Sequence, residues 1–176
     1  ESWEGALANM PQAPIADQCE GAAMLYSSGT TGYPKGVKRP LPEAGYGEAE
    51  DINLLRILYG ADEDSIYLSP APLYHAAPLA FCMGCLRNGV TVVVMQHFSP
   101  EFALACIEQY RATHSQWVPT MFVRMLKLPE AERLRYDLSS LRCAIHAAAP
   151  CPIPIKEQMI EWWGKIIYEY YHPYNN

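Results

Sequence analysis

The sequence has few charged residues of either sign and no apolar run of membrane-spanning length. Charged residues make up 18% of the chain and the formal net charge is −6, without a basic stripe, so we do not expect a nucleic-acid-binding protein. No apolar run reaches about 18 residues, and no basic segment followed by an apolar one opens the chain as a secretory signal would. We expect a cytoplasmic protein without a transmembrane segment, and the sequence leaves its oligomeric state open.

The cysteines do not follow the pattern of a disulfide-stabilised domain. All six are scattered, most of them in apolar segments, which favours free thiols in a reducing compartment. Cys82 and Cys85 form a single CxxC pair, whereas a structural zinc site needs four ligands. We therefore interpret both as buried thiols and predict no metal site.

The chain does have the hydrophobic content and the alternating pattern of a globular α/β domain. Half of its 176 residues are hydrophobic, enough for roughly one domain with a sizeable core. Apolar segments alternate with helical patterns, and this order predicts right-handed βαβ units, that is, a parallel sheet with helices on both faces. The expected strands are 65–68, 90–95, 114–118, 141–147 and 165–171, and the expected helices are 48–60, 75–86, 99–111, 119–128 and 153–163. Ligands bind such sheets beyond the carboxyl ends of the strands.

The N-terminal part has a different character. Residues 1–21 show little periodicity, so we interpret them as a linker that leads into the fold. Residues 22–27 form a short, unbroken apolar run that predicts a buried strand, and residues 37–40 predict a second short strand.

Between these two strands lies a segment with the composition of a phosphate-binding loop. Its glycines allow backbone amides to converge on an anion, its hydroxyls donate hydrogen bonds, and its lysine supplies a mobile positive charge. It is not a Walker A loop, because Lys35 is followed by Gly36 and soon by Pro40 instead of a helix. An ordinary Gly/Ser/Thr surface loop is the alternative. The candidate phosphate-binding residues are Ser27, Ser28, Gly29, Thr30, Thr31, Gly32, Lys35 and Gly36.

The order Ser-Gly-Thr-Thr-Gly-x-Pro-Lys-Gly at residues 28–36 resembles the phosphate-binding signature of the adenylate-forming (AMP-binding) superfamily. That superfamily includes acyl-CoA synthetases, aryl-CoA ligases, luciferases and peptide-synthetase adenylation domains. The resemblance implies that residues 22–171 are a partial AMP-binding domain, belonging to the large N-terminal domain of such an enzyme. It also implies ATP, Mg²⁺, coenzyme A and a small carboxylic acid as cofactors and substrates, with Lys35 as a catalytic residue.

A second resemblance concerns the segment Pro72-Leu73-Tyr74-His75. In acyl- and aryl-CoA ligases a similar segment lines the carboxylate pocket, which implies that His75 is catalytic and contacts the substrate carboxylate or the adenylate phosphate. An imidazole can donate to an anion without a permanent charge. The alternative is a histidine satisfied by the backbone at a helix start. We interpret His97 and His114 as structural.

Two further segments resemble the parts of the family that pass the nucleotide. His-Ala-Ala-Ala-Pro at 146–150 is similar to Ser-Gly-Ala-Ala-Pro, which implies contacts from Ala147 and Ala148, with an Ala-rich packing turn as the alternative. Tyr-Glu-Tyr-Tyr at 168–171 resembles the start of the next signature. It implies that Tyr171 stacks on adenine and that Glu169 and Tyr170 lie beside the nucleotide. Residues 172–176 depart from the pattern, so we interpret them as an atypical tail, for which a non-native origin is one explanation.

Within the family we favour an acyl-CoA synthetase for a fatty or other hydrophobic acid. No acidic residue between Ser65 and Glu101 could hold a substrate amine, and residues 76–78 are small and apolar. An aryl-CoA ligase and a peptide-synthetase adenylation domain are the alternatives within the family. A non-catalytic nucleotide-binding module and an inert truncated fragment are the alternatives outside it. Since the chain begins at Glu1 without a methionine, we expect a piece of a longer protein that is incomplete for catalysis.

Overall fold

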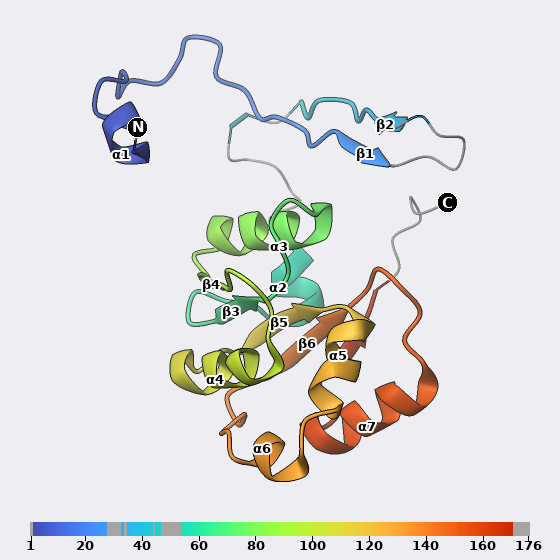
Figure 1. Ribbon diagram of the computed structural model, residues 1–176. Coiled ribbons are helices and arrows are strands. Elements are labelled where there is room, and N and C mark those ends of the chain that lie inside the picture. Colours follow the sequence, from blue (N-terminus) through green and yellow to red (C-terminus); the bar gives the residue numbers. More distant parts are fainter. Residues whose placement is uncertain (1, 28–32, 34, 44, 47–53, 171–176) are drawn as a thin grey trace. The chain divides into compact units, whose positions relative to one another are not determined.

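The computed structural model divides the chain into two units, residues 1–50 and 51–176 (Figure 1). The described residues are 2–27, 33, 35–43, 45–46 and 54–170. The boundaries expected at residues 21 and 171 stay predictions, and the tail at 172–176 lies outside the described residues.

The first unit contains a short helix that the sequence analysis did not predict. Helix α1 (Trp3–Leu7) lies inside the expected linker, and the Ser2 hydroxyl accepts a hydrogen bond from the Gly5 N–H at 3.1 Å. A serine at this position satisfies one of the free N–H groups that begin every helix.

The same unit contains a β-hairpin that differs from the predicted buried strand. Strand β1 (Leu25–Ser27) pairs with β2 (Lys35–Val37) in an antiparallel register. Leu25 and Tyr26 are 38% and 69% exposed, so the prediction of a buried strand at 22–27 is wrong. Two strands alone cannot cover both of their faces, which is why the apolar run stays open here. The second strand also begins earlier than the predicted residue 37.

The second unit contains a five-stranded sheet in the order β4-β3-β5-β6-β7, and every neighbouring pair is parallel. Its strands are β3 (Ile66–Ser69), β4 (Thr91–Val94), β5 (His114–Trp117), β6 (Cys143–His146) and β7 (Ile167–Glu169). Its helices are α2 (Leu54–Tyr59), α3 (Ala76–Arg87), α4 (Pro100–Tyr110), α5 (Pro119–Leu126), α6 (Glu130–Leu134) and α7 (Ile153–Trp163). The prediction of an α/β fold with a parallel sheet is confirmed. Helix α6 was not predicted, and residues 48–53 of the helix expected at 48–60 lie outside the described residues.

Helices cover both faces of this sheet, as predicted. Successive residues of a strand point to opposite faces, so Tyr67 and Leu68 of β3 belong to two different cores. Tyr67 packs in the core that contains Cys85 of α3, whereas Leu68 shares its core with Leu104 of α4 and Phe122 of α5. Figure 1 shows α2 and α3 on one side of the sheet and α4, α5 and α7 on the other.

Helix α4 begins where the sequence predicts. The Ser99 hydroxyl accepts a hydrogen bond from the Phe102 N–H at 3.1 Å, and Pro100 occupies the first helical position. The helix ends at Tyr110, and the C-cap residue Arg111, whose φ of 52° is left-handed, turns the chain toward β5. In the described part of the chain, no helix is long and apolar enough to cross a membrane.

Candidate functional site

The predicted phosphate-binding loop is described only at its two ends. Ser28, Gly29, Thr30, Thr31 and Gly32 lie outside the described residues. The Cα of Ser27, the last residue of β1, pairs with that of Lys35, the first residue of β2. A Cβ at Gly36 would lie 2.5 Å from the methyl carbon of Met24 and 3.1 Å from a ring carbon of Tyr26. Gly36 therefore has a packing role on the hairpin, beside its predicted role in phosphate binding.

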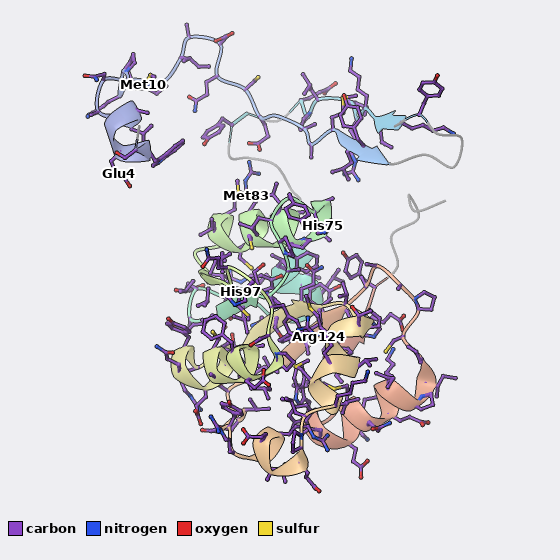
Figure 2. The ribbon with its side chains drawn as sticks, in the orientation of Figure 1. Glu4, Met10, His75, Met83, His97 and Arg124 are labelled. Carbon is purple, nitrogen blue, oxygen red and sulfur yellow. The ribbon has the colours of Figure 1, made fainter. Side chains whose placement is uncertain are left out.

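His75 lies where β3 has ended and α3 begins (Figure 2). It occupies the N-cap position, yet its side chain makes no capping hydrogen bond, so the imidazole is not used to satisfy the start of this helix. The side chain is exposed, and its ring centroid is 4.5 Å from that of Tyr74. The alternative of a histidine satisfied by the helix backbone thus finds no support in the capping geometry.

Ala147 and Ala148 form a sharp turn directly after β6. The Ala147 N–H donates to the carbonyl of Trp117 at 3.3 Å, which extends the pairing of β6 with β5 by one bond. Ala148 then adopts a φ of 75°, a left-handed conformation that costs roughly 1 kcal/mol for a residue with a Cβ. The small side chains leave the backbone of this turn accessible.

Glu169 and Tyr170 have partners within the second unit. A carboxylate oxygen of Glu169 lies 2.6 Å from Nζ of Lys156 in α7, and this hydrogen bond lowers the pKa of Glu169. The Tyr170 N–H donates to the carbonyl of His146 at 3.2 Å. Its hydroxyl accepts from Nε2 of Gln116, also at 3.2 Å, and burial raises the pKa of the phenol. Tyr171, predicted to stack on adenine, lies outside the described residues.

These segments share one edge of the parallel sheet. His75 follows the carboxyl end of β3, Ala147 that of β6, and Tyr170 that of β7. Parallel strands end at the same edge, and loops that follow them form the ligand sites of open α/β sheets. The geometry of the second unit therefore agrees with a ligand site at this edge.

His146 itself was not among the predicted site residues. His146 is fully buried at the end of β6, and neither ring nitrogen has a hydrogen-bond partner among the described residues. Its Nε2 lies 3.8 Å from the Glu169 carboxylate, and burial lowers the pKa of the imidazole. The only signal in the sequence was its position, where the resembling motif has a serine.

His114 and the two cysteines of the CxxC pair are buried, which agrees with the interpretation of His114 as structural and of the cysteines as buried thiols. The His114 ring is 3% exposed, with Nδ1 2.8 Å from the Thr113 hydroxyl and Nε2 2.9 Å from the Tyr59 carbonyl. Cys82 and Cys85 are free and buried, and burial raises the pKa of Cys85 to about 12. Among the described residues, no group of three or more His, Cys, Asp or Glu side chains could hold a metal ion.

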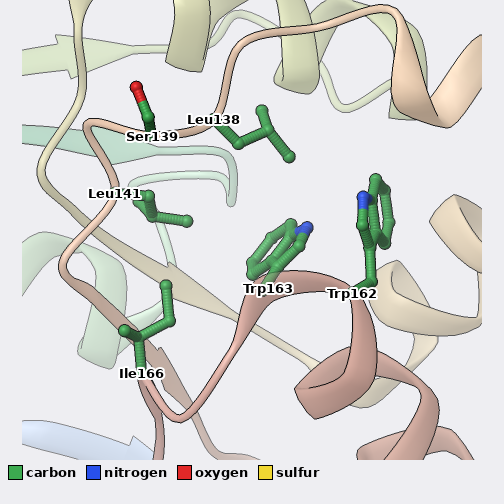
Figure 3. Close-up of a pocket in the computed structure, with 6 residues that line it drawn as sticks. All are labelled: Leu138, Ser139, Leu141, Trp162, Trp163 and Ile166. Atoms are coloured by element: carbon green, nitrogen blue, oxygen red, sulfur yellow. The ribbon is translucent and has the colours of Figure 1, made fainter.

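A pocket of about 240 Å³ lies at the opposite edge of the sheet, before the amino ends of β6 and β7 (Figure 3). Because ligands of parallel sheets bind at the carboxyl edge, this pocket is not part of the candidate site. The residues that line it are Leu138, Ser139, Leu141, Trp162, Trp163 and Ile166.

Known proteins with similar sequences are CoA ligases. A probable CoA ligase of Humulus lupulus is 33% identical in an alignment of 153 residues that covers 82% of this chain and 26% of that protein. A 4-coumarate–CoA ligase of Petroselinum crispum is 36% identical over 143 residues, 80% of this chain and 26% of that protein. The chain thus spans about a quarter of the length of these relatives.

Solved structures show the same relationship. An amide bond synthetase of Marinactinospora thermotolerans superposes with a TM-score of 0.72 at 29% identity, covering 85% of this chain and 28% of that one. An O-succinylbenzoate CoA synthetase of Bacillus subtilis, solved with AMP, gives a TM-score of 0.65 at 29% identity, covering 80% and 27%. The chain therefore has the fold of part of the N-terminal domain of an adenylate-forming enzyme. Residues 1–173 match the AMP-binding enzyme family, and the chain belongs to that family.

Proposed function

We propose that the protein containing this chain activates a carboxylic acid with ATP and transfers the acyl group to the thiol of coenzyme A. The observation that carries the proposal is the common placement of His75, Ala147 and Tyr170 beyond the carboxyl ends of strands in one sheet. The CoA ligases among its relatives support the same chemistry.

The reaction has two steps. A carboxylate oxygen attacks the α-phosphorus of ATP, the bond between the α-phosphorus and its bridging oxygen breaks, and pyrophosphate leaves with the electron pair. The CoA sulfur then attacks the acyl carbon, the bond to the adenylate oxygen breaks, AMP leaves, and the thiol proton passes to a base or to water. Activation is needed because a carboxylate resists attack by a thiol, whereas an acyl adenylate carries a good leaving group.

In this proposal Lys35 and the loop from Ser27 to Gly36 hold the β- and γ-phosphates and offset the charge that develops on pyrophosphate. His75 donates to the acid carboxylate or to the adenylate phosphate. Ala147 and Ala148 allow a flat ligand to approach the backbone, with Glu169, Tyr170 and Tyr171 beside the nucleotide. Mg²⁺ enters with ATP as part of the substrate.

The first experiment is acid-dependent exchange of labelled pyrophosphate into ATP by the full-length protein. Three panels of acids are tested. Fatty acids test the predicted preference for a fatty or other hydrophobic acid, whereas aryl acids and amino acids test the two alternatives within the family. We expect exchange with at least one panel. Nucleotide binding without exchange for any acid would favour a binding module instead.

The acceptor needs its own assay because one similar structure belongs to an amide bond synthetase. The enzyme charged with its best acid is offered coenzyme A and, separately, simple amines. We expect a thioester to form faster than an amide. The reverse order would assign the protein an amide-forming role while leaving the first step unchanged. The cytoplasmic location stays a prediction.

A further inference from the structure

Four polar side chains meet on the α3 side of the sheet, near its carboxyl edge. Tyr67 and Ser69 belong to β3, Gln116 belongs to β5, and Tyr170 follows β7. Tyr67 and Ser69 are 1% exposed and Gln116 is 5% exposed, whereas Tyr170 is half-buried. So many polar groups in one buried layer require hydrogen-bond partners.

Contacts join Tyr67, Phe81 of α3, Gln116 and Tyr170, and with Ser69 of β3 these residues are here named the Gln116 cluster. Nε2 of Gln116 donates to the Tyr170 hydroxyl at 3.2 Å. The Phe81 ring stacks on Tyr67 with a centroid distance of 6.3 Å and lies 5.7 Å from the ring of Tyr170. The pairing of Tyr67 with His114 and of Leu68 with Ser115, continued by one residue, places Ser69 opposite Gln116.

Two polar atoms of the Gln116 cluster lack partners. The Tyr67 hydroxyl and the Gln116 side-chain carbonyl are buried without a hydrogen bond to any described residue. The Ser69 hydroxyl has the Cys82 thiol as its hydrogen-bond partner, and a thiol forms only weak hydrogen bonds. Burial raises the pKa of Tyr67, so its phenol keeps its proton and can donate. A buried polar group left without a partner is destabilising, so the Tyr67 hydroxyl and the Gln116 carbonyl together point to a partner from outside this set.

We propose that Gln116 is a specificity-determining residue and that the acid activated at this site has an apolar body carrying a hydroxyl group. The inference rests on the proposed function. The Gln116 carbonyl can only accept, so the partner must donate, while the hydroxyls of Tyr67 and Ser69 can donate to the same group in return. A hydroxyl does both, and the Phe81 and Tyr67 rings supply apolar walls for the rest of the acid.

The test compares acids that differ only in a hydroxyl, using pyrophosphate exchange by the full-length protein. Suitable pairs are 4-coumarate with cinnamate and an ω-hydroxy fatty acid with its parent. In the pair that the protein uses better, we expect kcat/KM for the hydroxylated acid to be at least about tenfold higher than for the acid without the hydroxyl. A site that hydrogen-bonds a hydroxyl group rejects the analogue that lacks it. In Gln116→Met, which keeps the length of the side chain without its polar atoms, the ratio should fall toward one.

Ser115→Ala is the matched control. Ser115 precedes Gln116 on the same buried strand, and its hydroxyl accepts from Trp117 Nε1 at 2.7 Å. This variant should lose stability without a change in the acid ratio. If Gln116→Met fails to fold, Tyr67→Phe removes a single oxygen from the same cluster and should lower the ratio as well.

The outcomes separate the two proposals. Exchange without a preference in either acid pair, or a preference unchanged in both cluster variants, would overturn the role of Gln116 and leave acid activation standing. Bound water would then satisfy these polar atoms. No exchange with any acid would overturn the proposed function and the inference that rests on it.

Discussion

Lys35 is the residue whose charge the proposed first step uses. Lys35→Ala in the full-length protein should lower kcat/KM for MgATP in pyrophosphate exchange by roughly 100-fold or more, because it removes a positive charge that offsets the charge on pyrophosphate. Lys38→Ala removes the same charge three residues further on and is the matched control, with an expected loss under about tenfold. Equal losses in both variants would mean that only the general charge of this segment matters.

Asp137 makes stability depend on pH at the end of α4. Its carboxylate accepts from the Ser139 N–H at 2.9 Å and contacts Arg111 Nη1 at 2.6 Å. Hydrogen bonds from Ser139, followed by the contact with Arg111, lower the pKa of Asp137 from 3.8 to about 2. A pKa lowered by folding means that the ionised form stabilises the native state above the unfolded pKa, and that this stabilisation is lost as pH falls toward the folded pKa.

We therefore expect Asp137→Asn to lower the melting temperature at neutral pH. The difference in melting temperature between this variant and the unsubstituted protein should disappear as pH falls from about 4 to about 2, and thermal unfolding across this range measures it. The same substitution at the exposed Asp64 is the control and should leave the curve unchanged. If the difference in melting temperature caused by Asp137→Asn were the same at every pH, the shape of the side chain would matter and its charge would not.

At the scale of single elements, helix α4 depends on its N-cap residue, Ser99. Ser99→Ala removes the side-chain acceptor of the Phe102 N–H and should cost about 1 kcal/mol of unfolding free energy, or roughly 2–4 °C in melting temperature. Ser99→Asp keeps an acceptor at the same place and should retain most of the stability. If Ser99→Asp were as destabilising as Ser99→Ala, the capping hydrogen bond would not be the cause.

Some elements could be predicted from the sequence and others could not, for physical reasons. Helix α4 could be predicted because Ser99, Pro100 and Glu101 are all local signals for a helix start. Helix α6 (Glu130–Leu134) was missed because it is a short turn after Pro129 without an apolar face. The strand at 22–27 was wrongly expected to be buried. An apolar run indicates that a segment is suited to burial, but it does not indicate which other segment covers it.

At the scale of the whole molecule, the sheet could be predicted while part of the candidate site could not. Strand–helix alternation restricts the topology to a parallel sheet, whose carboxyl edge carries the segment after each strand. The unpartnered polar atoms of Gln116 and His146 depend on contacts between residues far apart in the sequence. No local pattern reports such contacts, and the polar residues in the buried strand β5 were the only hint.

The most direct test of the account follows the oxygen atoms of the acid. The full-length protein is incubated with MgATP, coenzyme A and its best acid, whose carboxylate carries the ¹⁸O isotope. The masses of the products are then measured by mass spectrometry. An acyl adenylate forms by attack of the carboxylate on the α-phosphorus, so one labelled oxygen should appear in AMP and the other in the thioester. Thioester formation with unlabelled AMP would contradict acyl-adenylate formation, the central claim made for this chain.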